Sequence, residues 1–201
     1  NILNNFKFKN LKIINQKKKG LASARNKGIL HSKGEFVIFL DSDDWLTTDA
    51  IDKYVNFLTK NKDIAYVYSN IVNKNQNNSI LRKNFNYFEQ LFTNQIPYSI
   101  LIRRAAFKKV GMYDENMPVM GFEDWDLNIR LGKEGFYGNC LDENLFNYNF
   151  SDEGMLQSLS RKNYSLLYNY IRNKNLNLYK FKSLFNIYKK FYKKKSTHYL
   201  F

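Results

Sequence analysis

Apolar and polar positions along the first three-quarters of the chain predict alternating strands and helices. Apolar runs at 12–14, 35–40 and 64–68 are typical of strands, and the second is continuous enough to be buried on both faces of a parallel sheet. Segment 97–103 is predicted to be extended, and the polar segment 73–79 to be a loop. Helices are predicted at 20–30, at 51–58 after a cap at Thr47 or Thr48, at 104–110 before Gly111, and at 122–134 before Gly135. This alternation indicates the α/β class.

The C-terminal segment has a different pattern. Its aromatic and leucine side chains fall on one helical stripe, and most of its lysines fall on the other side. The stripe contains Phe181, Leu184, Phe185, Tyr188, Phe191 and Tyr192, and the lysines are Lys182, Lys189, Lys190 and Lys193. We therefore predict an α/β domain at 1–152 and a basic amphipathic helical tail at 153–201.

Composition narrows the class of protein. A chain of 201 residues suits one domain with an appendage, and no apolar run is long enough to cross a bilayer. The net charge is +14, and from residue 157 onward the chain has eleven basic residues and no acidic one. Such a block can bind nucleic acid or an anionic membrane, or can simply be solvated. The single cysteine, Cys140, excludes an internal disulfide and is expected to be a small buried residue of a protein in a reducing compartment.

Two aspartates follow the predicted strand 35–40. Side chains two apart in an extended chain point to the same face, so the carboxylates of Asp41 and Asp43 could converge on one hard cation, Mg²⁺ or Mn²⁺. A Mg²⁺-type site usually takes one or two protein carboxylates and leaves positions for substrate phosphates, which implies a diphosphate partner. The alternative is a turn in which one aspartate caps the next helix. These residues alone do not separate the two interpretations.

A second acidic segment, 121–126, places three carboxylates around the first turn of a predicted helix. The helix dipole and the free backbone N–H groups there favour an ionised carboxylate, so Asp124 could accept a proton from a hydroxyl. Acidic residues in a first helical turn are more often only stabilising. Taken alone, this segment favours the stabilising role.

Three motifs occur together in a particular order, at 20–29, 33–46 and 111–131. Together they resemble the signature of family 2 glycosyltransferases over roughly 12–148. The resemblance implies a GT-A-type, Rossmann-like mixed sheet flanked by helices. It also places Arg25, Asn26 and Ser42 near the nucleotide sugar, Asp41 near the ribose and the metal, Asp43 on the metal, Asp124 as the general base, and Gly121, Glu123 and Trp125 on the acceptor side.

The resemblance also implies a reaction. A metal-dependent, inverting hexosyl- or N-acetylhexosaminyl-transferase would use Mn²⁺ or Mg²⁺ and move a sugar from a UDP-sugar to a hydroxyl of a glycan or lipid-linked acceptor. The expected setting is bacterial surface polysaccharide synthesis in the cytoplasm. The tail at about 175–195 is expected to bind the inner face of the membrane peripherally. The alternative is that its apolar stripe packs on the catalytic domain or on a second subunit and that its lysines are merely solvated.

The chain departs from the family pattern at two places. It begins after the family's first strand and nucleotide-binding segment, so we expect an N-terminally truncated domain that is a poor catalyst by itself. After Tyr148 come residues 149–153, where the family often has an arginine and a histidine, so an additional histidine ligand is not predicted. His31 and His198 match no motif and are interpreted as incidental.

Two other functions fit parts of the sequence. A nucleic-acid-binding protein would explain the basic and aromatic tail, but no nucleic-acid motif is present and no nucleic acid is expected as a partner. A glycosidase also uses carboxylates, but it needs two that flank one bond and has no use for a metal–diphosphate pair. The closely spaced Asp41 and Asp43 favour transfer over hydrolysis.

Overall fold

The computed structural model describes residues 10–73, 78–150 and 159–192. Its strands form a single sheet in the order β1-β5-β3-β6-β2, with β4 beside β3. The strands are β1 (Phe36–Val37), β2 (Trp45–Leu46), β3 (Tyr66–Asn73), β4 (Asn78–Ile80), β5 (Leu101–Arg103) and β6 (Gly138–Tyr148). The helices are α1 (Leu21–His31), α2 (Ala50–Lys60), α3 (Tyr87–Gln90), α4 (Arg104–Lys109), α5 (Glu123–Lys133), α6 (Tyr164–Lys174), the 3-10 helix η3 (Leu176–Tyr179) and α7 (Phe181–Tyr192).

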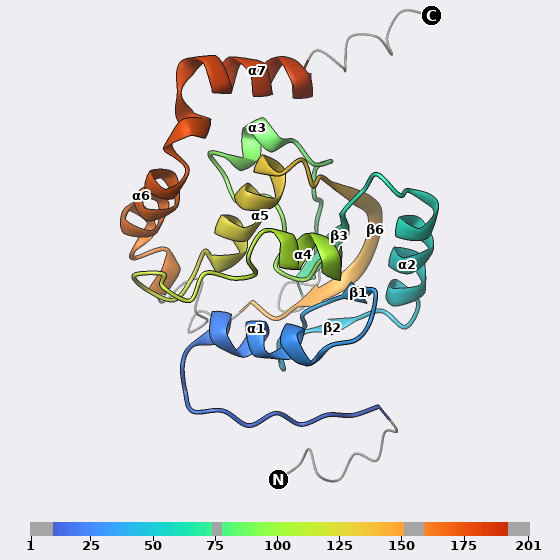
Figure 1. The fold of residues 1–201 in the computed structure, drawn as a ribbon. Helices are drawn as coiled ribbons and strands as arrows, with labels where there is room; N and C mark the ends of the chain where they lie inside the picture. The colour runs from blue at the N-terminus through green and yellow to red at the C-terminus, as the bar shows by residue number, and fades with distance from the viewer. Residues whose placement is uncertain (1–9, 74–77, 151–158, 193–201) are drawn as a thin grey trace, which may run out of the picture.

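The sheet is mixed, as predicted. β3 and β6 run parallel at its centre, with Tyr66 opposite Gly138, and the other pairs are antiparallel. Successive side chains of β3 enter different cores because side chains alternate along a strand. Tyr66 and Tyr68 face α1, α4 and α5, whereas Val67 faces Tyr54 of α2. Figure 1 shows α2 on one side of the strands and α4 and α5 on the other.

Two strand predictions need correction. Residues 12–14 form no strand, and Ile13 is exposed. Of segment 35–40 only Phe36–Val37 is a strand, it pairs antiparallel with β5 rather than in a parallel sheet, and Leu40 is 45% exposed. A strand is defined by its ladder, and among the described residues β5 is the one partner of β1.

Other elements differ from the sequence pattern in extent. β4 occupies part of the predicted loop 73–79, of which 74–77 lie outside the described residues, and the longest strand, β6, was not predicted. Helix α2 begins after Asp49 without a side-chain cap, and the hydroxyl of Thr47 donates instead to Asp49. The helices predicted at 20–30, 104–110 and 122–134 are confirmed, with Gly111 and Gly135 at φ values of 86° and 80° where the latter two end.

The helical tail packs against the α/β part. Leu167 and Ile171 of α6 share a buried cluster with Trp125 of α5, and Lys174 Nζ lies 2.8 Å from a carboxylate oxygen of Asp126. Figure 1 shows α6 and α7 along the side of the molecule that carries α5 and α3. The division at residue 152 stays a prediction, since 151–158 lie outside the described part.

The apolar stripe of α7 is divided. Leu184 and Phe191 pack against the cluster that contains Tyr87 and Trp125, whereas Phe181 is 84% exposed and Phe185 is 45% exposed. Lys193 and the two lysines after it lie outside the described residues. No helix in the described part of the chain is both long and apolar enough to cross a membrane.

Candidate active site

A cavity of about 390 Å³ opens where α1, the loop after β1, the start of α5 and the end of β6 meet. It brings together segments that are far apart in the sequence. Its polar and charged walls are formed by Arg25, Asp41, Asp43, Asp44, Arg82, Asn94, Tyr98, Glu123, Asp124, Tyr148, Asn149 and Ser160. Six of the nine predicted site residues therefore line one cavity: Arg25, Asp41, Asp43, Gly121, Glu123 and Asp124.

Arg25 joins two walls of this cavity. Its Nη2 donates to both oxygens of Asp41, at 3.0 and 3.2 Å, and its Nη1 donates to Glu123 at 2.9 Å. Its guanidinium also lies 4.8 Å from the ring centroid of Tyr98. Burial lowers the pKa of Arg25, but the charges of Tyr113, Glu123 and Asp41 outweigh it, so the net shift is upward. Arg25 therefore stays charged and fixes both acidic segments.

The aspartates at 41–44 lie in a turn rather than in an extended strand. The backbone N–H of Asp44 donates to the carbonyl of Asp41 at 3.2 Å, so the same-face argument from strand geometry was wrong for this pair. The turn of the alternative interpretation is therefore present, but its helix cap is not, because the N-cap of α2 is Asp49 and no side chain caps that helix. Asp41 and Asp43 nevertheless line the same cavity.

Asp44 is the buried member of the turn. Its Oδ2 accepts from the Tyr98 hydroxyl at 2.5 Å and its Oδ1 from the backbone N–H of Asn149 at 2.8 Å, while the Tyr98 hydroxyl accepts from the N–H of Asp41 at 2.9 Å. Burial raises the pKa of Asp44. With both oxygens of Asp44 bonded and Asp41 held by Arg25, the exposed Asp43 is the carboxylate of the turn left to contact a ligand.

Asp124 lies in the first turn of α5. Its Oδ2 accepts from Asn94 Nδ2 at 3.2 Å, and its Oδ1 from the backbone N–H of Trp125 at 2.8 Å. Burial raises the pKa of Asp124, and the charge of Arg25 and the Asn94 hydrogen bond oppose that shift. Burial also raises the pKa of Glu123, to about 7. A buried carboxyl whose proton affinity has been raised suits a general base, because its pKa then lies closer to neutral pH.

The backbone before α5 is strained. Phe122 adopts the left-handed conformation at φ 59°, and Gly121 has φ 126°. A Cβ on Gly121 would lie 2.1 Å from the hydroxyl of Ser160. Glycine therefore lets the chain turn sharply at the cavity wall and present Glu123 and Asp124 to it.

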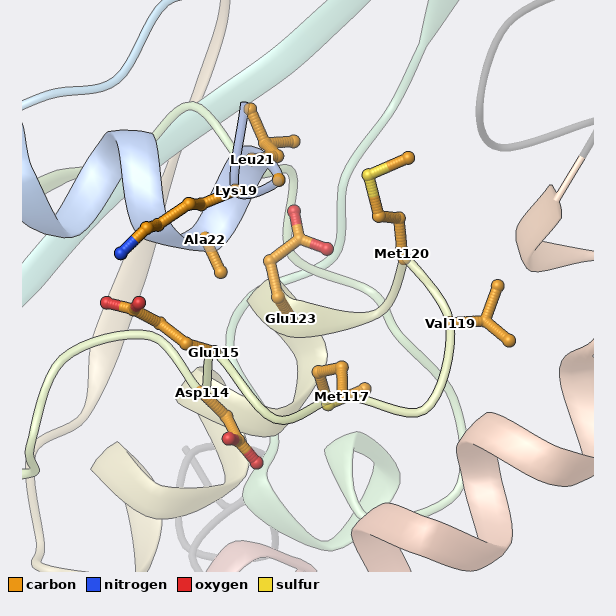
Figure 2. A pocket seen from close by; sticks show the side chains of 11 residues that line it. Lys19, Leu21, Ala22, Asp114, Glu115, Met117, Val119, Met120 and Glu123 are labelled. Carbon is orange, nitrogen blue, oxygen red and sulfur yellow. The ribbon is translucent and has the colours of Figure 1, made fainter. Parts of the chain in front are cut away.

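A smaller cavity of about 50 Å³ lies on the other side of Glu123. Figure 2 shows Glu123 among Leu21, Met117 and Met120, with Asp114 and Glu115 on the neighbouring loop. Leu21, Gly121 and Glu123 line both cavities, so the main cavity and this mostly apolar space share a wall at the starts of α1 and α5.

Three predicted site residues do not line the main cavity. Asn26 is buried and bonded to another loop, since its Nδ2 donates to the Tyr113 carbonyl at 2.9 Å and its Oδ1 accepts from the Tyr113 N–H at 2.9 Å. Trp125 is 1% exposed and donates from Nε1 to the Gln90 carbonyl at 2.7 Å. Ser42 is exposed in the turn.

Sequence reasoning missed Arg82, Asn94, Tyr98 and Tyr148. They lie in or after segments whose pattern carried no motif, and only the fold brings them to the acidic residues. The pair Pro97-Tyr98 at the start of the predicted extended segment 97–103 was the local signal available for one of them. Cys140 is a buried free cysteine, as predicted, and a ring nitrogen of exposed His31 lies 2.8 Å from the Lys27 carbonyl of its own helix.

The donor atoms of the turn fit a Mg²⁺-type ion better than zinc. No group of three His, Cys, Asp or Glu side chains in the described part of the chain could hold a metal ion by itself. Oxygen ligands and one or two carboxylates are nevertheless what such an ion takes from protein when substrate phosphates complete its shell. Asp43 satisfies that requirement as a single carboxylate, with Asp41 bound to Arg25 on the same cavity wall.

The chain belongs to glycosyl transferase family 2, whose model matches residues 1–124. It is 27% identical to the uncharacterized glycosyltransferase YwdF of Bacillus subtilis, over 71% of this chain and 55% of the relative. It is 37% identical to the Escherichia coli UDP-Glc:alpha-D-GlcNAc-diphosphoundecaprenol beta-1,3-glucosyltransferase WfgD, over 35% of this chain and 27% of that protein. It is 28% identical to the hyaluronan synthase of Pasteurella multocida, over 62% of this chain and 13% of that protein, so it spans only part of each relative.

Solved structures show the same fold. S. aureus TarS 1-349 aligns with a TM-score of 0.62 and 16% identity, over 87% of this chain and 53% of that one. A complex of the same protein with UDP-GlcNAc aligns with a TM-score of 0.59 and 15% identity, over 72% of this chain and 43% of that one. The mixed sheet flanked by helices is thus GT-A-like, as the resemblance implied.

Proposed function

We propose that this chain carries the catalytic cavity of a metal-dependent, inverting glycosyltransferase. It would move a hexosyl or N-acetylhexosaminyl group from a UDP-sugar to a hydroxyl of a glycan or lipid-linked acceptor. The observation that carries the proposal is the cavity shared by exposed Asp43, Arg25-bound Asp41 and half-buried Asp124. A cation-binding carboxylate and a candidate base on the walls of one cavity are what transfer from a nucleoside diphosphate requires.

The donor side of the proposal rests on the turn 41–44. Asp43 would hold Mg²⁺ or Mn²⁺ together with phosphate oxygens of the donor, and Asp41, which Arg25 binds through both oxygens, would lie beside the ion. The ion would offset the negative charge that builds on the departing diphosphate. Arg25 and Tyr98 keep this turn in place by binding Asp41 and Asp44. The TarS complex with UDP-GlcNAc, a structure of similar fold, supports a UDP-sugar donor.

The acceptor side rests on the start of α5. Asp124 would take the proton of the acceptor hydroxyl while the acceptor oxygen attacks the sugar carbon. Because the attack comes from the face opposite the departing diphosphate, the configuration of that carbon would be inverted. Asn94 holds the carboxylate of Asp124 toward the cavity. Gly121 and Glu123 line the same wall, whereas Trp125 supports it from the core. The names of WfgD and of the hyaluronan synthase support a lipid-linked or glycan acceptor and a role in bacterial surface polysaccharides.

The location proposed for this activity is the cytoplasmic face of a membrane. The exposed rings of Phe181 and Phe185 on α7, with Lys182 and Lys189 nearby in sequence, support peripheral binding there. A lipid-linked acceptor would be presented at that surface.

Binding of UDP in the presence of Mn²⁺ tests the proposal directly. Asp43→Ala removes a proposed metal ligand and should weaken Mn²⁺-dependent UDP binding by about ten-fold or more, because the phosphate charge is left uncompensated. Titration calorimetry with and without Mn²⁺ measures the change. Asp52→Ala, at an exposed acidic position on α2, is the matched control and should bind as the unaltered chain does. Equal UDP affinity for Asp43→Ala and the control would show that the metal assignment is wrong.

A further inference from the structure

The main cavity contains a second cationic side chain besides Arg25. Arg82 follows β4, and its backbone N–H donates to Asn70 Oδ1 at 2.7 Å, which fixes its position against β3. Its side chain lines the cavity that also contains Asn94 and Asp124. Sequence motifs gave this arginine no role, so its place on the cavity wall calls for a physical explanation.

The two arginines differ in their partners. Arg25 is bound to Asp41 and Glu123 at 2.9–3.2 Å. Arg82 forms no ion pair with any described residue, and its Nε is buried without a hydrogen-bond partner. A buried donor without an acceptor destabilises a protein unless a ligand supplies the acceptor. Burial also lowers the pKa of Arg82, which reflects the cost of holding this charge away from water.

We propose that Arg82 binds a phosphate oxygen of a substrate in this cavity, an inference that rests on the proposed function above. A guanidinium presents a planar fork of N–H donors that matches phosphate geometry, and charge-assisted bonds of this kind are stronger than neutral ones. The phosphate can belong to the donor diphosphate or to a phosphorylated acceptor. Arg82 lies on the same walls as Asp124, where donor sugar and acceptor would meet.

Arg82→Gln and its neighbour Lys83→Gln form a matched pair for the test. Both replace a cation by an amide, but the side chain of Lys83 is 77% exposed and lies outside the cavity wall. The 201-residue chain is titrated in Mn²⁺ with UDP, and then, at saturating UDP, with N-acetylglucosamine 1-phosphate. The first probe represents the donor phosphates and the second a phosphorylated acceptor.

Arg82→Gln should lose about ten-fold or more in affinity for one of the two probes, and Lys83→Gln should lose nothing. Loss for UDP assigns Arg82 to the donor, and loss only for the sugar phosphate assigns it to the acceptor. Arg82→Lys keeps the charge but not the planar fork of donors, so its affinity for that probe should lie between those of the unaltered chain and Arg82→Gln. If the glutamine variant does not fold, Arg82→Lys replaces it in the test.

Two results would overturn the inference. If Arg82→Gln and Arg82→Lys bind both probes as tightly as the unaltered chain, Arg82 holds no substrate phosphate. A lower melting temperature for Arg82→Gln with unchanged affinities would instead assign Arg82 a structural role. If the unaltered chain binds neither probe, the proposed function fails together with this inference, whereas UDP binding that is insensitive to Arg82 leaves the proposed function standing.

Discussion

The three aspartates of the turn 41–44 have the same side chain but different surroundings. Asp41 is neutralised by Arg25, Asp44 is buried against Tyr98 and Asn149, and Asp43 is exposed. Their chemistry follows from these partners, because a carboxylate bonded on both oxygens has little capacity left for a cation. The sequence could predict that the turn is acidic and follows an apolar segment. It could not predict which aspartate is buried, since the partners of Asp44 are 54 and 105 residues away.

Asp124 can be tested as a base without disturbing the fold. Asp124→Asn keeps an oxygen for the Trp125 N–H but cannot accept the acceptor's proton. We expect turnover to fall by ~10²-fold or more, while the dissociation constant for UDP stays nearly unchanged, because a general base acts on the acceptor and not on the diphosphate. Steady-state kinetics with a UDP-sugar, together with UDP titration and a melting curve, measure these effects. Parallel losses of UDP binding and melting temperature would point to a structural role instead.

Glu123 gives a prediction for pH. Burial raises its pKa from 4.5 to about 7, so between these values the folded chain binds a proton that the unfolded chain does not. The free energy of unfolding therefore decreases as pH rises through about 7, and the contribution of Glu123 is fully present only below the unfolded pKa. The melting temperature of Glu123→Gln should depend less on pH between about pH 5 and about pH 8 than that of the unaltered chain. Glu134→Gln, at an exposed position just after α5, should leave the pH dependence unchanged.

Helix α5 connects the site with the core through residues on different faces. Its first turn presents Glu123 and Asp124 to the cavity, while Leu127 and Ile129 pack in two separate buried clusters. Helix periodicity and the flanking glycines were enough to predict this helix. The same rules failed for β1 and β6. The extent of a strand depends on its ladder partners, which lie far away in the sequence.

Two helical glycines should respond to alanine in opposite ways. Gly28 of α1 has open space where a Cβ would lie, whereas a Cβ on Gly132 of α5 would lie 2.1 Å from the ring of Tyr87. Gly28→Ala should stabilise the fold by about 0.5–1 kcal/mol, because alanine loses less backbone entropy in a helix. Gly132→Ala should destabilise it by roughly 1–3 kcal/mol through overpacking. Denaturant unfolding measures both, and equal effects of the two substitutions would contradict the packing described for Tyr87.

Over the whole molecule, the excess positive charge is concentrated in the sequence from residue 157 onward, but it is not all free for a partner. Lys174 binds Asp114 and Asp126, and Lys190 Nζ donates to the Tyr137 hydroxyl at 2.9 Å. Part of the tail's charge and half of its apolar stripe therefore hold the helices against the α/β part. The sequence predicted the amphipathic helix correctly. It could not divide the stripe between packing and exposure, because that division depends on the aromatic cluster around Tyr87 and Phe85.

The exposed half of the stripe leads to a prediction about membranes. Phe181 and Phe185 stack on each other at 6.1 Å between ring centroids, with Lys189 Nζ 4.1 Å from the Phe185 ring, so an apolar ridge and a lysine occupy the same exposed surface. Each basic residue near an anionic leaflet contributes about 1 kcal/mol of binding, and apolar rings add to this by entering the headgroup region. The chain should therefore float with anionic liposomes at low salt and not with neutral ones. The double variant Phe181→Ala, Phe185→Ala should lose most of this binding, whereas Leu30→Ala, which removes a 62% exposed side chain on α1, should keep it. If the unaltered chain stays at the bottom of the gradient with anionic liposomes at low salt, the ridge does not bind membranes.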